Sequence, residues 1–575
     1  MNDNTPLTKK EILPSRPPFY FKPEEIPVGA KVIKVLDVDY VHVRTRDGGD
    51  LYVTRYGLPF ISILWPDRWY FSEQARQTLW EKLPGTGTVH RVNLKKAHQA
   101  PIDVVIKWSR IGQDVPGRNP DTLDDYDTGE FNSPFEEFSS LMEMRDSCYE
   151  SPGRIRTHKP LAIFVPAERI DPDSLGRKEY RFNTRDKDVD IELDLHRQYL
   201  LMYEWVKGVD AVEARKVLGY PMEFLKTITL NVEQELIAKG FQDSDRKPNH
   251  IIVRTNKGAL VEDSKRKKPL YAYIDFEMLR RTPQREKMVI ESKRAAYLTR
   301  QRDRFLPHNP VSLPPHLHLV NILGVDYIYG TVESTGGALW VVGRDPSLFD
   351  YFLPERWRRT PRTKISHTHE AYRTTTKDGI HLVWKVSKVG EKPVFFEQTD
   401  ANKRIMSFGY NSPFEEYALA IELSRQGLPT NYPRAIYRTG YQALTSDYMA
   451  DNQRYETHKD IVMPDGTPVL QKEYHYMEIW GYWNGPDELL AVRDGEFYSG
   501  INMLHARNEG IISQEVFKEV LEKEQQRFAH AGIEDLYLRA EDFNIALDPK
   551  GHLVLDSDGK PELRCTSFEF MKRLT

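Results

Sequence analysis

The chain contains two copies of one long sequence pattern. The stretch FNSPFEEFSSLMEM at 131–144 returns as YNSPFEEYALAIEL at 410–423. Upstream of it, IDVVIKWSRIG at 102–112 returns as IHLVWKVSKVG at 380–390. Three further pairs keep the same order along the chain: VDYVHV and VDYIYG, PDRW and PERW, and KPLYAYIDFEMLRR and KPELRCTSFEFMKR. Matches at five ordered places predict a duplicated domain of about 270 residues, a period far too long for a solenoid.

Composition and charge are those of an ordinary globular protein. Of 575 residues, 39% are hydrophobic and 29% are charged, which is enough to bury real cores. The net charge of −4 gives no global basic field, so we expect neither nucleic acid nor a membrane as a partner. Two cysteines, Cys148 and Cys565, exclude a disulfide framework and favour a reducing compartment. With no signal peptide and no long apolar run, we expect a cytoplasmic protein.

The order of strand and helix patterns within one copy predicts an α+β domain with two lobes. IDVVIKW at 102–108 is rich in β-branched residues and predicts a strand. The Ser-Pro pair that opens 133–144 is a helix N-cap and first-turn signal. A buried strand is predicted within 196–208, and an amphipathic helix that ends at a glycine over 222–240. Two short strands, HIIVR and LYAYIDF, complete the copy.

Taken in this order, residues 35–305 resemble the protein-kinase-like fold. VVIK ends in Lys107, which resembles the kinase lysine that contacts the α- and β-phosphates of ATP. Glu137, on the following helix, resembles the ion-pair partner of that lysine, with Glu136 and Glu143 as the alternatives. The resemblance therefore implies a nucleotide site built on a strand and the helix after it.

DRKPNHIIV resembles the kinase catalytic loop D-x-K-P-x-N-I-L. The resemblance implies that Asp245 is the catalytic base and that Lys247 binds the γ-phosphate. YIDFE resembles the D-F-G segment, which implies that Asp275 is a ligand of Mg²⁺ or Mn²⁺. His250 stands where kinases keep a metal-binding asparagine, and Asn249, one residue earlier, is the alternative ligand. Because Mg²⁺ prefers oxygen ligands, the histidine predicts the loss of one metal site or an altered metal preference.

LLMYEWVKG resembles the kinase hinge, which implies that the backbone of Glu204, Trp205 and Val206 binds adenine. The sequence departs from the typical protein-kinase pattern in two ways. Glu277 replaces the glycine of D-F-G, and about 30 residues separate Asp275 from the second copy, which leaves room only for a reduced C-lobe. These features resemble lipopolysaccharide kinases and other small atypical kinases more than the eukaryotic regulatory type.

The second copy, residues 320–575, resembles the same fold in weaker form. Lys385 and Glu416 repeat the lysine and the helix glutamate, which implies that nucleotide binding survives. LRAEDFNIAL is matched to the catalytic loop through Asn544. In that match the base position is Arg539, the loop-lysine position is Glu541, and Ser567 stands where the first copy has Asp275. Because arginine cannot accept a proton, we expect a pseudokinase-like domain.

Other polar clusters are interpreted as structural. His316 and His318, like His367 and His369, have H-x-H spacing, but no third zinc ligand is evident and exposed strand or linker histidines are expected. The basic stretch 264–304 is interpreted as a solvated hairpin tip followed by an inter-domain helix, with a docking surface for an anionic partner as the alternative. Asp556 and Asp558 are expected in a hairpin turn and not at a metal.

The sequence thus predicts an α+β protein with two tandem kinase-like, two-lobed domains. We expect a proline-rich N-terminal arm at 1–30, an active kinase-like domain at 31–305 and a pseudokinase-like domain at 306–575. The predicted function is that of a bacterial-type phosphotransferase that uses ATP with Mg²⁺ or Mn²⁺. The acceptor, a protein or a small molecule, stays open, and a partner protein could dock on the second copy. The alternatives are a binding scaffold with two inactive copies and a transferase with other nucleotide chemistry, such as AMP transfer.

Overall fold

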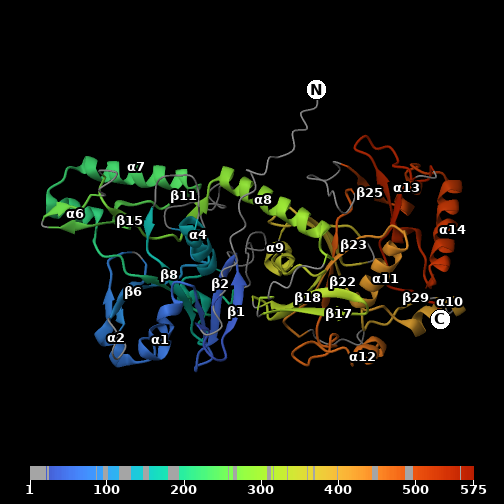
Figure 1. The fold of residues 1–575 in the computed structure, drawn as a ribbon, viewed down its shortest axis with the longest axis horizontal. Helices are drawn as coiled ribbons and strands as arrows, with labels where there is room; N and C mark the ends of the chain where they lie inside the picture. The colour runs from blue at the N-terminus through green and yellow to red at the C-terminus, as the bar shows by residue number, and fades with distance from the viewer. Residues whose placement is uncertain are drawn as a thin grey trace. The chain divides into compact units, whose positions relative to one another are not determined.

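The computed structural model describes the chain from Phe21 to Leu574, with gaps at 22–24, 86, 95–100, 116–130, 147–154, 179–192, 257, 263–267, 307–312, 315, 333, 359, 367–368, 396, 398, 443–450, 486–496 and 557–558. It forms two compact units that divide between Val289 and Ile290 (Figure 1). We call the described residues up to Val289 the N-terminal unit and those from Ile290 the C-terminal unit. Both residues of the division belong to one helix, α8 (Pro283–Arg302).

Some expectations fall on residues outside this description. They are residues 1–20 and 22–24 of the arm expected at 1–30, Cys148, residues 264–267 of the basic stretch, His367 and Asp558. Among the helices that the structure describes, none combines the length and the apolar character needed to cross a membrane.

The N-terminal unit is built on an eight-stranded antiparallel sheet with the strand order β1-β2-β3-β8-β9-β6-β5-β4. Every residue of the central strand β8 is buried, as its continuous apolar run PLAIFV requires. The strands are β1 (Lys31–Val35), β2 (Val38–Arg44), β3 (Asp50–Val53), β4 (Trp80–Lys82), β5 (Val89–Leu94), β6 (Ile102–Trp108), β8 (Pro160–Val165) and β9 (Leu200–Glu204). Helix α4 (Pro134–Asp146) packs on the sheet, where its Phe138 and Leu141 are fully buried.

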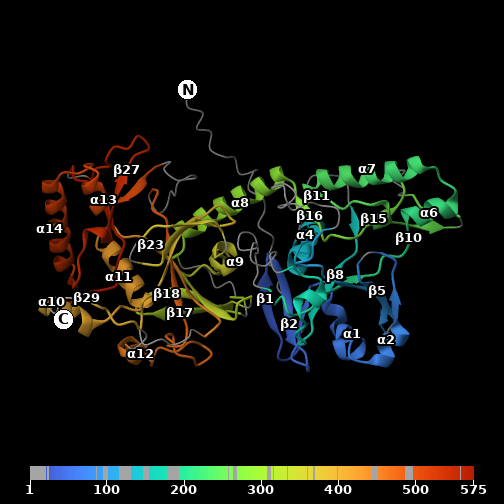
Figure 2. The same ribbon diagram turned by 180° about the vertical axis from the view of Figure 1, so that it is seen from behind.

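The second lobe of the N-terminal unit is small. It contains the helices α6 (Ala211–Leu218) and α7 (Met222–Ala238), which lie close to each other in both views (Figure 2). Its strands are β7 (Arg156–Thr157), β10 (Val209–Asp210), β11 (Phe241–Asp243), β12 (Ile251–Val253), β15 (Tyr271–Tyr273) and β16 (Leu279–Arg281). They form a four-stranded sheet, β10-β12-β15-β7, and a pair, β11-β16. Helix α7 ends just before Gly240, which has a positive φ of 77°.

The sheet of the C-terminal unit repeats the strand order of the first. Its order is β17-β18-β19-β23-β24-β22-β21-β20, again with antiparallel neighbours. The strands are β17 (Leu317–Ile322), β18 (Val325–Val332), β19 (Gly337–Val342), β20 (Arg362–Lys364), β21 (Ala371–Thr375), β22 (His381–Val386), β23 (Tyr432–Arg438) and β24 (Tyr476–Gly481). Even an irregularity recurs, because the register shifts at Pro160/Ala162 in one sheet and at Pro433/Ala435 in the other.

Helix α11 (Pro413–Arg425) covers one face of this second sheet, and its Phe414, Tyr417 and Leu423 belong to the buried cluster there. The smaller lobe contains α13 (Met503–Asn508), α14 (Gln514–His530) and the strands β25 (Ser499–Asn502), β26 (Ile533–Asp535), β27 (Phe543–Leu547), β28 (Leu563–Cys565) and β29 (Met571–Arg573). The unit also contains α9 (Pro354–Trp357), α10 (Asp400–Phe408) and α12 (Gln453–His458). Both units thus combine mainly antiparallel sheets with packed helices, which is an α+β architecture.

Candidate active site

The N-terminal unit buries a lysine at the end of an inner strand. Strand β6 lies between β5 and β9, and Lys107 on it is 8% exposed. Its Nζ lies 3.2 Å from Glu137 Oε1, 2.6 Å from Asp275 Oδ1 and 3.2 Å from Glu277 Oε2. Because a buried ammonium is tolerated only with paired charges, these contacts tie the sheet to α4 and to the loop after β15.

The partner of this lysine on α4 is Glu137. The two alternatives face elsewhere, because Glu136 Oε2 accepts the amide of Ser133 at 2.7 Å and Glu143 pairs with Arg281 at 2.7 Å. Glu137 Oε1 also accepts the hydroxyl of Tyr203 at 2.6 Å. Strand β9 and helix α4 therefore both fix the position of this carboxylate.

The charges of the cluster are set by burial and by one another. Burial lowers the pKa of Lys107, but the charges of Asp275 and Glu137 outweigh this effect and raise that pKa well above its usual value. Burial raises the pKa of Asp275, but the charges of Lys107 and His250 outweigh it and lower that pKa to about 2. Burial raises the pKa of Glu137. Lys107 and Asp275 are therefore a charged pair at neutral pH.

The loop that carries Asp275 is held in an unusual conformation. The φ of Asp275 is 72°, in the left-handed region that non-glycine residues rarely adopt. Elsewhere among the described residues, non-glycine residues with positive φ occur only in the β1–β2 and β17–β18 turns. The Asn132 amide donates to the carbonyls of Phe276 at 3.1 Å and Leu279 at 2.9 Å, which holds the loop in place. Local strain of this kind is typical of functional positions.

Two further side chains, those of Asp245 and His250, lie close to Asp275. One ligand atom from each of Asp245, His250 and Asp275 lies within 4.8 Å of the other two, a spacing that suits a metal ion. The His250 Nε2 is 3.6 Å from Asp275 Oδ2, whereas Oδ1 faces Lys107. Lys247 Nζ lies 2.7 Å from Asp245 Oδ1. Asn249 is exposed, so the structure brings His250 and not its neighbour to the aspartate.

A further carboxylate, Asp243, lies behind this set and was missed by the sequence analysis. It is 3% exposed, and its Oδ1 accepts the amide of Asp245 at 2.8 Å, which fixes the start of the loop. Burial raises its pKa to about 7, and the charges of Asp275 and Asp245 act in the same direction. The signal that could have found it is the Asp-x-Asp spacing at the end of strand β11.

The expected hinge is only partly available to a ligand. The amide of Glu204 donates to the carbonyl of Lys159 at 2.9 Å, and the amide of Trp205 donates to the carbonyl of Asp103 at 3.1 Å. These two amides are therefore already bonded within the unit, so the prediction that this stretch binds adenine now depends on its other backbone groups. The amide of Val206 and the carbonyls of this stretch remain as candidates.

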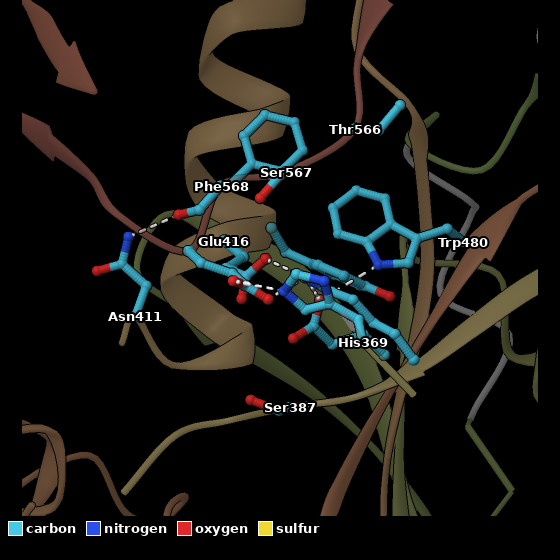
Figure 3. A network of polar contacts seen from close by, with 12 residues as sticks. His369, Ser387, Asn411, Glu416, Trp480, Thr566, Ser567 and Phe568 are labelled. Atoms are coloured by element: carbon cyan, nitrogen blue, oxygen red, sulfur yellow. Dashed lines mark hydrogen bonds and ion pairs between the residues drawn. The ribbon is translucent and has the colours of Figure 1, made fainter. Parts of the chain in front are cut away.

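The C-terminal unit has a different polar network around its lysine, and Figure 3 shows Glu416 and His369 of this network. Lys385 Nζ lies 2.7 Å from Glu416 Oε2, 3.3 Å from Glu478 Oε2 and 3.7 Å from Glu569 Oε1. All three carboxylates are buried, and Glu478 is 0% exposed. Its strand pairing places Glu478 opposite Lys385, at the position where Leu201 pairs with the lysine of the other unit.

The pKa values of this second cluster reflect its burial. Burial, and next Glu478, raises the pKa of Glu416 well above its usual value. Although burial opposes the change, Lys385 and His369 lower the pKa of Glu569 to about 2. His369 Nε2 lies 3.0 Å from Glu569 Oε2. His369 is thus part of the buried network, and its interpretation as an exposed linker histidine is wrong.

The strand pairing also corrects the match between the two loops. Ile251 pairs with Tyr273 in β12–β15, and Phe543 pairs with Cys565 in β27–β28. The turns that precede these pairs, at 248–250 and 540–542, therefore correspond residue by residue.

Tyr537 therefore occupies the position of Asp245, Arg539 that of Lys247, and Asp542 that of His250. The sequence match, which was made through Asn544, is two residues out of register. The sequence could not show this because the turn in the second copy lacks the proline and the asparagine of the first. Ser567 does stand at the position of Asp275, as expected.

His158 is a second residue that the sequence analysis missed. Its ring stacks on Tyr203 with centroids 4.0 Å apart and lies 5.3 Å from the ring of Phe276, the residue after Asp275. Burial, and next the charge of Lys107, lowers the pKa of His158 to about 3. The ring is therefore a neutral support beneath the site.

We expect His158 to stay neutral between pH 8 and pH 5. The unfolded chain takes up this proton near the ordinary histidine pKa of 6.5, but the folded unit does so only near a pKa of about 3, so the folded unit loses stability as the pH falls from 6.5 toward 3. The measurement is an NMR titration of ¹³Cε1-labelled histidine, in which His158→Gln identifies the signal. A His158 signal with a midpoint near pH 6.5 would contradict the buried, neutral ring.

Comparison with known proteins adds little to this geometry. No protein-family model matches the chain, and no curated protein matches it. Among the solved structures that match is one described as "Crystal structure of BubR1 kinase domain", with a TM-score of 0.19 and 11% sequence identity. The match covers 43% of this chain and 52% of that one, about half its length. A likeness this distant carries no argument, and the function has to be inferred from the site.

Proposed function

We propose that the N-terminal unit transfers the terminal phosphoryl group of ATP to an acceptor. The observation that carries this proposal is the set of groups around Asp275: its Oδ1 is 2.6 Å from Lys107, its Oδ2 is 3.6 Å from His250, and Asp245 offers a ligand atom within 4.8 Å of both. Phosphoryl transfer needs a cationic side chain at the phosphates, ligands for a divalent ion and a group that orients the acceptor. This site offers residues for all three tasks.

A divalent cation fits the residues present. Two carboxylates and one imidazole form the donor set, and their spacing within 4.8 Å allows one ion to contact all three. Asp245, His250 and Asp275 would hold it. Such an ion neutralises negative charge that develops on the phosphates.

The side chains around the cation have separate tasks in this proposal. Lys107 binds phosphate oxygens and shares its ammonium with Asp275, which keeps the lysine charged. The side chain of Lys247 is 50% exposed and can bind the terminal phosphate. Asp245, 31% exposed, accepts the proton of the acceptor hydroxyl. Glu137 holds Lys107 in position from α4.

We further propose that the chain is an internal duplication of a kinase-like domain. Two sheets with one strand order and the same proline-associated register shift support this proposal. So does the constant spacing of the smaller lobes, in which α7 begins at Met222 and α14 at Gln514, and β16 begins at Leu279 and β29 at Met571.

The C-terminal unit is proposed to have no transfer activity and no nucleotide site at Lys385. Three buried carboxylates surround its ammonium, and one of them, Glu478, comes from the sheet itself and cannot swing aside with a loop. Tyr537 and Ser567 at the positions of Asp245 and Asp275 leave few ligands for a cation. A supporting or docking role is what remains for this unit.

Replacing Asp275 with asparagine should abolish most of the turnover. The change keeps the size of the side chain but removes the charge that pairs with Lys107 and faces the cation. Loss of one such electrostatic group lowers kcat by on the order of a hundredfold or more. The assay is ATP consumption with detection of a phosphorylated product, and Ser567→Ala in the C-terminal unit is the matched control.

Activity of Asp275→Asn equal to that of the unaltered protein would refute the phosphotransferase proposal. A product that carries AMP in place of phosphate would assign the site to the alternative transferase chemistry. Absence of any ATP turnover in the unaltered protein, across a panel of protein and small-molecule acceptors, would favour the binding scaffold.

Nucleotide binding should depend on one of the two buried lysines. Lys107→Met removes a charge-assisted contact to phosphate and should weaken ATP affinity roughly tenfold or more. Lys385→Met should leave ATP affinity unchanged, although it should lower the thermal stability because it strands three buried carboxylates. Isothermal titration calorimetry and thermal unfolding of both variants provide the measurements. Equal losses of affinity in the two variants would show that the C-terminal unit also binds nucleotide.

A further inference from the structure

The cation site of the N-terminal unit contains a nitrogen donor that is built into the fold. The amide of His250 donates to the carbonyl of Lys247 at 3.0 Å, and the carbonyl of His250 accepts the amide of Ile274 at 2.9 Å. The second bond links the backbone of the histidine to the residue directly before Asp275. Ring and carboxylate are therefore set side by side by the pairing of β12 with β15.

The ring is placed so that it can reach an ion. Its Nε2 is 3.6 Å from Asp275 Oδ2, too long for a hydrogen bond between the two but short enough for both to contact one cation. The side chains of His250 and Asp275 are 15% and 26% exposed, which allows an ion to enter from solvent while most of its shell is protein. Asp245 completes the set, and since a carboxylate has two oxygens, one can face the ion while the other accepts a proton.

The donor types decide which ion binds best. Mg²⁺ strongly prefers oxygen ligands and gives up its water reluctantly, so an imidazole contributes little to its binding. First-row transition ions accept imidazole nitrogen and carboxylate oxygen together. We propose that this site selects a divalent first-row transition ion, represented by Mn²⁺, over Mg²⁺, and that His250 Nε2 is a direct ligand. The inference rests on the proposed phosphotransferase for the purpose of the ion, but the binding itself can be measured alone.

The C-terminal unit supplies an internal comparison. At the three corresponding positions it has Tyr537, Asp542 and Ser567, which is one carboxylate in place of two and no imidazole. That carboxylate is 4% exposed and lies 2.8 Å from Arg539, which neutralises it. The same loop therefore folds with these donors absent, so the arrangement in the N-terminal unit is not a requirement of the architecture.

The direct test uses the full-length protein without nucleotide or acceptor. Mn²⁺ is titrated into the protein, and its electron paramagnetic resonance signal reports the free ion. Electron spin echo envelope modulation of bound Mn²⁺ then reports nitrogen ligands, and ¹⁵N-histidine labelling identifies them. We expect a histidine nitrogen coupling and tighter binding of Mn²⁺ than of Mg²⁺. Bound Mn²⁺ without nitrogen coupling, or Mg²⁺ that displaces Mn²⁺ at equal concentration, would overturn the proposal.

A pair of variants assigns the nitrogen. His250→Asn should weaken Mn²⁺ binding by at least the roughly tenfold that loss of even an outer partner of a metal ligand costs, and should narrow the preference over Mg²⁺. His552→Asn is the control, because His552 forms an exposed pair with Asp548 at 3.4 Å and tests adventitious binding by such pairs. Unchanged Mn²⁺ affinity in His250→Asn, or an equal loss in the control, refutes the assignment. The nitrogen coupling of the unaltered protein decides the case if His250→Asn fails to fold.

These results are separate from the test of the proposed function. If the protein binds Mn²⁺ through a histidine nitrogen but transfers no phosphoryl group, the metal site is supported and the phosphotransferase proposal is refuted. Phosphoryl transfer with Mg²⁺, combined with Mn²⁺ that shows no nitrogen coupling, would keep the function and remove the inference about the ion.

Discussion

Each unit has to accommodate an ammonium group inside a sheet. Lys107 and Lys385 are both 8% exposed, on inner strands where water cannot solvate them fully. Such a charge is stable only when it is paired with carboxylates. In both units one carboxylate comes from the helix that follows the strand and at least one from the loop after β15 or β28, and in the C-terminal unit Glu478 of strand β24 adds another. The position of α4 or α11, and the path of the loop that returns to the sheet, therefore both depend on this one cation.

The two units differ in where they keep the third carboxylate. In the N-terminal unit it is Asp275, on a loop and 26% exposed at the side chain, so one of its oxygens remains available to other partners. In the C-terminal unit it is Glu478, on a strand and fully buried, while the loop position is Ser567. The number of carboxyl groups around the lysine is thus the same, but only the first arrangement leaves a charged, accessible edge on which a phosphate and a cation could meet. Moving the third carboxylate from the loop to the strand can therefore remove the accessible site while the buried lysine stays paired.

Uncharged neighbours hold the residues of the Lys107 cluster in position. Asn132 fixes the loop of Asp275, Tyr203 fixes Glu137, and His158 fills the space between Tyr203 and Phe276 as a neutral ring. None of these residues carries a charge at neutral pH, so they orient the ionic groups without altering their balance. The strained backbone at Asp275 is held by such uncharged contacts.

The sequence alone determined the α+β class, the strand of Lys107, the helix of Glu137 and the choice of Asp245 and Asp275 as candidates, because local periodicity and short ordered patterns carry that information. It left three glutamates open on α4, and only the direction in which the helix faces the sheet chose Glu137. It misplaced the loop of the second copy by two residues and left out Asp243, His158 and Glu478. These residues were missed because strand register and burial decide their roles, and both depend on contacts between segments that are separate in the chain, such as those of Lys385 and Glu478. A local sequence pattern does not contain the charge balance around the buried lysine, because that balance exists only after the sheet, the helix and the loop have packed together.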